Sequence, residues 1–179
     1  PNGDHRSLKE LAQNLAVRRS HHSHRLSIVA SSKEEALEKL GAFIEGESRP
    51  AMYTGRATGH DPRKLTFVFS GQGPQWWAMG RELLMNDSLF RSVIEKCDGL
   101  FRSHGASWSL MEELTASEDR SRMHVTAIAQ PAIFALQVAL AELWRSWGIV
   151  PTAVVGHSVG EIAAAYVAGA LSLGDAAKV

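Results

Sequence analysis

Residues 153–173 read AVVGHSVGEIAAAYVAGALSL, in which a short apolar run leads through a glycine-flanked serine into a second apolar segment. The run at 153–156 predicts a small buried strand, and the pattern from 159 to about 168 predicts a helix. Gly156, Ser158 and Gly160 fit the spacing G-x-S-x-G at this junction. A serine at a sharp strand-to-helix turn is held in a strained backbone geometry that exposes its hydroxyl, and the glycines remove side chains that would collide. Ser158 is therefore the candidate nucleophile.

The pentapeptide alone leaves two interpretations open. Three fixed positions recur by chance in roughly one chain in twenty of this length, given the usual frequencies of Gly and Ser. A glycine-rich turn with a helix-capping serine would give the same letters. The flanking strand and helix favour the catalytic interpretation. A helix beginning at Val159 would aim free N–H groups and its positive dipole end at an anion beside the serine.

A second glycine-rich turn, GQGPQ at 71–75, directly follows a predicted strand at 65–70. Two glycines around Gln72 leave backbone amides uncovered at the carboxyl end of a strand, where open α/β sheets place their sites. One such amide could join the N–H of Val159 in a two-donor oxyanion hole, the element that contributes most to acyl transfer. A tight turn with glycines at positive φ is the alternative.

The remaining pattern divides the chain into a small α+β unit and an α/β domain with a parallel sheet. In the first unit, Ser7 with Glu10 and Ser32 with Glu35 form capping boxes ahead of two amphipathic helices. A strand is expected at 26–30, a short strand near 52–54, and a Gly- and Pro-rich connection at 47–64. In the second part, further helices are expected at 88–101, 110–114 and 131–147, the last with Pro131 in its first turn.

Composition excludes several classes of protein. Of the 179 residues, 45% are apolar and 21% charged, as in a globular protein, and 19 Lys plus Arg balance 19 Asp plus Glu, which argues against a polyanion partner. The single cysteine, Cys97, allows no internal disulfide and is expected to be buried. No signal peptide or membrane span is predicted. The chain opens on Pro1, and we expect a piece of a longer cytoplasmic polypeptide.

Two clusters of side chains suggest other sites. The sequence HHSH at 21–24 could bind a metal, but neighbouring arginines would repel a cation, and a polar patch against a neighbouring domain is the better interpretation. Five tryptophans could form a stacking surface, although core packing is favoured because they lie in or near helical patterns.

Three segments taken together, FVFSGQGPQWWAMG, TAIAQPAIFALQ and AVVGHSVGEIAAAYVAGALSL, resemble the acyltransferase domain of type I polyketide synthases. Bacterial malonyl-coenzyme A:acyl-carrier-protein transacylases are more distant members of the same group. The resemblance runs over 65–179 and implies the N-terminal part of an α/β-hydrolase-like acyltransferase domain. Residues 1–64, with LAVRRSHHSHRLSIVASS, resemble the ketosynthase-to-acyltransferase linker, which implies an upstream ketosynthase in the same polypeptide.

The resemblance also assigns roles. Ser158 would attack the thioester of an acyl-coenzyme A, hold the acyl group as an ester, and pass it to the phosphopantetheine thiol of an acyl carrier protein. The oxyanion donors would be the backbone amides of Gln72 and Val159. His157 and Gln130 would be supporting residues, with His157 packing within the turn. No metal and no tightly bound cofactor are implied.

The resemblance leaves part of the site outside this sequence. The family's general-base histidine and its carboxylate-binding arginine are both expected beyond Val179, so the isolated chain is expected to be inactive or nearly so. An apolar residue after the serine, here Val159, and the segment TAIAQ ending at Gln130 favour malonyl over methylmalonyl units, although Ile128 replaces the usual aromatic residue.

Two other functions are kept open. A serine esterase or thioesterase of the α/β-hydrolase type shares the turn and would release free acid. A non-catalytic scaffold would never be acylated at Ser158.

Overall fold

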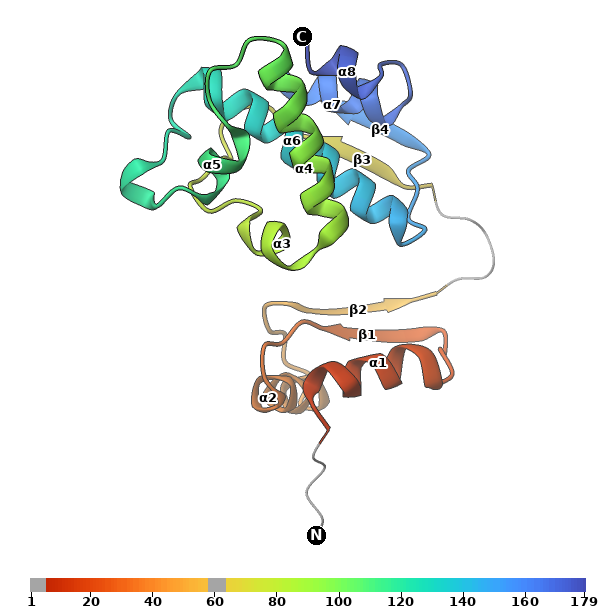
Figure 1. Ribbon diagram of the computed structural model, residues 1–179. Coiled ribbons are helices and arrows are strands. Elements are labelled where there is room, and N and C mark those ends of the chain that lie inside the picture. Colours follow the sequence, from red (N-terminus) through yellow and green to blue (C-terminus); the bar gives the residue numbers. More distant parts are fainter. Residues whose placement is uncertain (1–5, 58–63) are drawn as a thin grey trace. The chain divides into compact units, whose positions relative to one another are not determined.

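A computed structural model describes residues 6–57 and 64–179 of the chain. The chain divides into two compact units, residues 1–62 and 63–179. Each unit has its own helices and its own two-stranded sheet, and each is described by itself below (Figure 1).

The first unit is a small α+β unit. Its elements, in chain order, are α1 (Leu8–Arg18), β1 (His24–Ile28), α2 (Lys33–Ile44) and β2 (Met52–Arg56). The two strands pair in antiparallel register, His24 opposite Arg56 and Ile28 opposite Met52, and both helices lie on one face of this two-stranded sheet (Figure 1). Strand β1 begins two residues before the predicted position.

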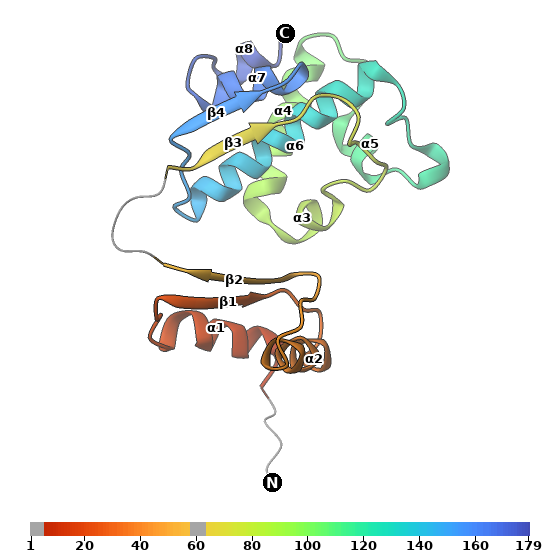
Figure 2. The same cartoon turned by 180° about the vertical axis from the view of Figure 1, so that it is seen from behind.

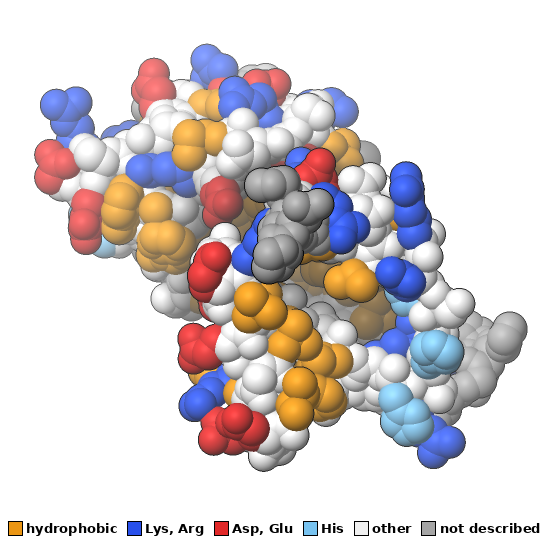
Figure 3. Space-filling model, turned by 90° about the horizontal axis from the view of Figure 1, so that it is seen from below, with side chains coloured by type: hydrophobic (Ala, Val, Ile, Leu, Met, Phe, Trp, Pro, Cys, Tyr) orange, Lys and Arg blue, Asp and Glu red, His pale blue; other side chains and the backbone are white. Residues whose placement is uncertain are grey.

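The first unit has almost no buried core among its described residues. Ala42 is the one buried residue in its described part, 6–57. Leu37 and Ile44 of α2 are 67% and 82% exposed, so this helix presents an apolar face. Figure 3, which views the molecule from below, shows hydrophobic side chains gathered in rows beside acidic ones.

Of the two predicted capping boxes of this unit, the first is present and the second is formed only in part. The N–H of Glu10 donates to Ser7 Oγ (3.2 Å), and the N–H of Ser7 donates to Glu10 Oε2 (2.6 Å), which confirms the first capping box and lowers the pKa of Glu10. At α2, Ser32 Oγ accepts the N–H of Glu35 (3.1 Å), but the Glu35 carboxylate takes the N–H of Ser31 instead. A hydrogen bond from Lys39, and then those from Ser31, lower the pKa of Glu35 to about 2.

The second unit is an α/β domain, as the sequence predicts. Its elements, in chain order, are β3 (Thr66–Phe69), α3 (Arg81–Asn86), α4 (Ser88–Ser103), α5 (Leu110–Thr115), the 3-10 helix η1 (Glu118–Arg120), α6 (Thr126–Ser146), β4 (Ala153–Gly156), α7 (Val159–Val167) and α8 (Leu173–Ala176). Strands β3 and β4 pair in parallel, with Thr66 opposite Ala153 and Phe69 opposite Gly156. The parallel sheet predicted from the order of elements is therefore present.

The layers of the second unit are visible from two sides. Figures 1 and 2 place α4 on one side of α6 and the β3–β4 sheet on the other. The opposite face of the sheet is open, since Val68 is 76% and Val155 54% exposed. Parallel sheets are ordinarily covered on both faces, and the described residues leave this face uncovered.

Helix α6 is the central element of the core. Ten of its residues are buried, and nine of them belong to one core cluster with buried residues of α4, α5 and α7. By length and composition α6 is also the one helix among the described residues that could cross a membrane, but 56% of its apolar window is buried within the protein. A core helix passes the same test.

The predicted start of this helix at Pro131 is wrong. Helix α6 begins at Thr126, because the N–H groups of Ile128 and Ala129 both donate to the carbonyl of Val125 (2.9 and 2.8 Å) and close a first turn without a side-chain cap. Pro131 lies one turn further on, where its missing N–H removes only one backbone hydrogen bond. Since Val125 cannot cap through its side chain, nothing in the sequence marked the true start.

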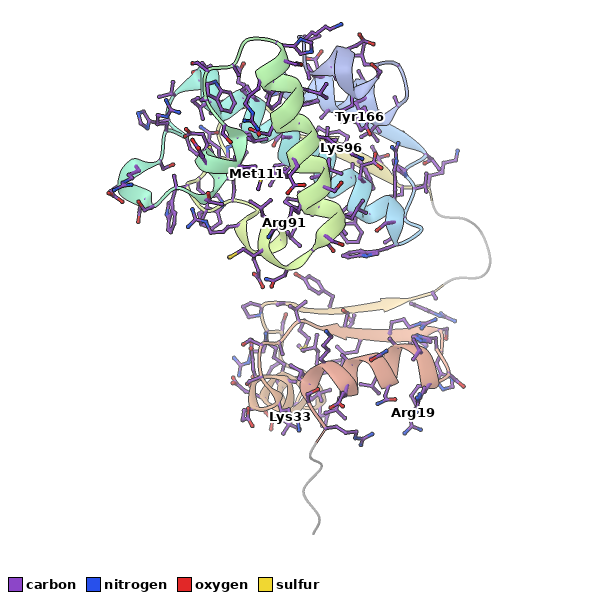
Figure 4. All side chains as sticks on the ribbon, in the orientation of Figure 1. Arg19, Lys33, Arg91, Lys96, Met111 and Tyr166 are labelled. Carbon is purple, nitrogen blue, oxygen red and sulfur yellow. The ribbon has the colours of Figure 1, made fainter. Side chains whose placement is uncertain are left out.

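Polar contacts join the end of α7 to α6. The hydroxyl of Tyr166, which Figure 4 labels on α7, donates to Glu142 Oε1 (3.1 Å). Arg145 donates to the same carboxylate (2.9 Å) and to the carbonyl of Val167. Burial, with the Glu142 charge, raises the pKa of the Tyr166 hydroxyl. These contacts hold the helix that begins at the candidate nucleophile.

Cys97 lies fully buried in α4, as expected, and its burial predicts low reactivity. Burial raises the pKa of the thiol from 9.0 to about 12. At pH 8 we expect iodoacetamide to modify native Cys97 at least about 10³-fold more slowly than urea-unfolded Cys97, measured by intact-mass spectrometry with Cys97→Ala as the blank. Equal rates would contradict this. Because the folded pKa is the higher, the thiol's contribution to stability is complete below pH 9 and is lost as pH rises toward 12.

Candidate functional site

The turn between β4 and α7 has the strained geometry that the sequence predicts. Ser158 has φ 54° and ψ −126°, and it is one of two non-glycine residues at positive φ among the described residues. An L-residue rarely adopts this conformation, which costs on the order of 1–3 kcal/mol. The side chain of Ser158 is exposed. A buried helix start thus carries a strained but accessible hydroxyl.

Three glycines allow the backbones to approach each other here. A Cβ on Gly160 would lie 2.3 Å from the carbonyl oxygen of Phe69, and a Cβ on Gly156 would lie 2.4 Å from the Cα of Glu161. A Cβ on Gly71 would lie 2.8 Å from Nδ1 of His157 and 3.2 Å from the Cβ of Ser158. Only glycine fits at the first two positions, because the colliding atoms belong to the backbone. The third glycine places the GQGPQ turn directly against the serine turn.

Backbone hydrogen bonds fix the serine turn and leave specific donors free. The N–H of His157 continues the sheet by donating to the carbonyl of Phe69 (3.0 Å), and the N–H of Ser158 donates to Glu161 Oε1 (3.2 Å). Across residues 6–57 and 64–179, neither the N–H of Val159 nor that of Gln72 donates to any other group. These two amides are the ones that the resemblance assigns to an oxyanion hole.

Side chains of α6 hold the side chain of Gln72. Its Nε2 donates to Thr126 Oγ1 (3.3 Å), and its Oε1 accepts from Gln130 Nε2 (3.2 Å). Within the turn, the N–H of Gly73 donates to Gln75 Oε1 (2.7 Å). Gln130, expected as a supporting residue, thus contacts Gln72.

His157 points its exposed side chain toward the GQGPQ turn, and no histidine of the described residues is hydrogen-bonded to Ser158. His21, His22 and His24 belong to the first unit, where His21 Nε2 contacts the carbonyl of Ala16 (2.7 Å). His5 and His60 lie outside the described residues. Within the described ranges no group of three or more His, Cys, Asp or Glu could hold a metal ion.

The tryptophans contradict the expectation of core packing in part. Trp77 and Trp108 are half-buried, but Trp76, Trp144 and Trp147 are 55%, 43% and 60% exposed. Trp144 and Trp147 pack edge to face at the end of α6, with ring centroids 5.2 Å apart. Helical spacing alone could not reveal that this end of α6 projects from the core.

Sequence reasoning missed two residues that touch the site from α6. Thr126 contacts Gln72, and Gln137 Nε2 donates to the carbonyl oxygen of Ser70 (2.7 Å), the residue directly before the GQGPQ turn. The sequence does carry a signal for them, because polar residues stand at positions 126, 130 and 137 of an otherwise apolar helix. These positions are four and seven residues apart and therefore share one helix face.

Two family models match the chain. Residues 66–179 match the acyl transferase domain, and residues 2–40 match the model described as CurL-like, PKS C-terminal.

Known polyketide synthases contain similar sequences. The chain is 43% identical over 165 residues to erythronolide synthase EryA2 of Saccharopolyspora erythraea, covering 92% of this chain and 5% of that protein. It is 44% identical over 170 residues to the spectinabilin polyketide synthase system protein NorA of Streptomyces orinoci, covering 95% of this chain and 9% of that protein. The chain thus spans less than a tenth of these synthases.

Solved structures show the same fold. The acyltransferase domain from module 8 of the salinomycin polyketide synthase superposes with a TM-score of 0.80 at 36% identity, over 98% of this chain and 41% of that one. The malonyl-CoA:ACP transacylase of Synechocystis sp. PCC 6803 superposes with a TM-score of 0.56 at 29% identity, over 65% of this chain and 37% of that one. From the matched domain model and these relatives, the chain belongs to the acyl transferase domain family and resembles the acyltransferase domains of modular polyketide synthases.

Proposed function

We propose that this acyltransferase-family chain supplies the nucleophile and the oxyanion hole for moving a malonyl-type unit from coenzyme A to an acyl carrier protein. Ser158 Oγ attacks the thioester carbonyl carbon and its proton passes to a base. The C–S bond then breaks, coenzyme A leaves as a thiol, and the acyl group stays on Ser158 as an ester. The phosphopantetheine thiol of the carrier protein attacks that ester and regenerates the serine hydroxyl.

One observation carries the proposal: an exposed serine in a strained turn, followed by a helix whose first N–H is free. The carbonyl oxygen becomes negative during attack, and two aimed N–H groups stabilise that charge at no reorganisation cost. Because Glu161 already accepts the N–H of Ser158, the amide of Val159 is the free donor on the helix side. The amide of Gln72 is the second donor, since Gly71 lies against Ser158.

The remaining roles rest on the family. The general-base histidine and an arginine for the substrate carboxylate are proposed to lie in the part of the acyltransferase domain that this chain does not span. Residues 1–64 are proposed as the linker from a ketosynthase in the same cytoplasmic polypeptide. No metal or tightly bound cofactor is proposed for this step.

The apolar side chain of Val159 supports malonyl as the preferred unit. Val159 is buried at the start of α7, directly beside the nucleophile. In the family that the chain resembles, an apolar residue after the nucleophile goes with malonyl units and a glutamine goes with methylmalonyl units. Val159 and the TAIAQ segment fit the malonyl pattern.

The test uses the full-length protein with equal concentrations of malonyl- and methylmalonyl-coenzyme A. We expect peptide mass spectrometry to find a malonyl ester on Ser158 and malonyl on the carrier protein in excess. A methylmalonyl excess would contradict the specificity alone. Free malonate without carrier loading would favour the hydrolase, and an unmodified Ser158 would favour the scaffold. Ser107→Ala, which removes an exposed serine away from the turn, is the matched control for Ser158→Ala.

A further inference from the structure

Gln137 of α6 makes contacts that packing alone does not explain. Its Nε2 donates to the carbonyl oxygen of Ser70 (2.7 Å) and lies 3.4 Å from Ser70 Oγ. Its Oε1 is fully buried and accepts no hydrogen bond from the described residues. Since a carbonyl needs a donor, the nitrogen must face Ser70, and rotating the amide would not satisfy both ends.

A buried acceptor without a partner is unfavourable, so an apolar side chain would be expected at this place in an apolar helix. Gln137 is surrounded along α6 by buried residues such as Ala135, Val138 and Ala139. The hydrogen bond from its Nε2 to the carbonyl of Ser70 therefore explains why a glutamine occupies this position. That bond joins positions 67 residues apart and fixes the last backbone group before Gly71.

The same face of α6 holds the next residues of the turn. Thr126 and Gln130 contact the side chain of Gln72 at 3.3 and 3.2 Å. Gln137 thus holds the residue before Gly71, and Thr126 and Gln130 hold the residue after it. Glycine has no side chain that could restrain its own backbone. The contacts to Ser70 and Gln72 therefore restrict the rotation of the peptide groups on either side of Gly71.

We propose that Gln137 is a positioning residue, which fixes the Ser70 carbonyl so that the backbone N–H of Gln72 faces the oxygen atom of an acyl group on Ser158. This rests on the proposed function. Gln137 touches no reacting atom and acts through the peptide groups of 70–72. A small displacement of an oxyanion donor costs transition-state stabilisation while leaving ground-state binding unchanged.

The test uses a fluorophosphonate probe, whose phosphoryl oxygen occupies an oxyanion hole while the serine oxygen displaces fluoride. In the full-length protein, Gln137→Met keeps the side-chain length and removes the donor. We expect the rate constant of Ser158 labelling to fall about tenfold or more. The Tm should change little, because the substitution takes the donor from the Ser70 carbonyl but also removes the unpaired Oε1 acceptor. In malonyl transfer, kcat should fall while KM stays unchanged. Gln13→Met, an exposed glutamine of α1, is the matched control.

Gln137→Glu adds a pH readout that a merely structural role would not give. A protonated carboxyl group can donate to the Ser70 carbonyl and a carboxylate cannot, so labelling relative to the unchanged protein should recover as pH falls.

The inference would be overturned if Gln137→Met were labelled at the same rate as the unchanged protein. It would also be overturned if the labelling rate fell only in proportion to the fraction of the variant that is unfolded. Either result would leave the proposed function standing. A pH-independent ratio for Gln137→Glu would also overturn it. Failure of the unchanged protein to be labelled at Ser158 would overturn both.

Discussion

Replacing Ser158 with alanine is expected to lower malonyl transfer to the carrier protein by at least about 10³-fold, because the proposed ester forms on the Ser158 hydroxyl. The measurement is carrier-protein loading by the full-length protein, followed by intact-mass spectrometry. The acyl-enzyme should disappear together with the activity. Transfer by the alanine variant at more than about a tenth of the unchanged rate would show that Ser158 is not the nucleophile.

Ser158→Gly makes a sharper pair with the alanine variant. Both remove the hydroxyl, but only glycine adopts φ 54° and ψ −126° without strain. We expect the glycine variant to be as inactive as the alanine variant while its free energy of unfolding rises by about 1 kcal/mol relative to alanine. Loss of activity with a gain in stability would separate the catalytic hydroxyl from any structural role. Equal stabilities would show that the turn is not strained.

Local patterns predicted most elements of this fold. The strand at Ala153–Gly156 was predicted with its observed bounds, and the helix after it ends within one residue of the prediction. Both are marked by short-range signals: an apolar run, two glycines and a return to helical spacing. The short elements α3, η1 and α8, of six, three and four residues, were missed, because such short segments give little periodic signal.

The errors lie where the sequence carries no local signal. A helix start at Thr126 depends on backbone bonds that no capping residue announces, and the exposed Trp144 and Trp147 depend on where α6 leaves the core. The candidate site divides in the same way. The glycines and Ser158 form a local pattern, whereas the contact between Gln137 and Ser70 spans 67 positions. Such contacts become visible only when the helix is folded against the turn.

Replacing Gly160 with alanine is expected to destabilise the second unit strongly, because the added methyl group has no room in the serine turn. Its Cβ would lie 2.3 and 2.6 Å from the carbonyl oxygens of Phe69 and Ser70 and 2.7 Å from the carbonyl carbon of Phe69. All three atoms belong to the backbone of β3 and its continuation, so no side chain can rotate away. Helix α7 must shift from the sheet, at a cost of roughly 3 kcal/mol or more.

The measurement is urea unfolding of this chain followed by tryptophan fluorescence, which reports on the second unit alone because all five tryptophans lie within 63–179. Gly99→Ala is the matched control: it adds the same methyl group within α4, where a Cβ meets nothing within 4 Å. Alanine favours a helix, so the control should gain roughly 0.5–1 kcal/mol. Opposite signs for the two changes would show that backbone contact, not helix propensity, requires glycine at 160. Similar effects would mean that α7 can move away from β3, and the proposed oxyanion hole would lose the close approach on which it depends.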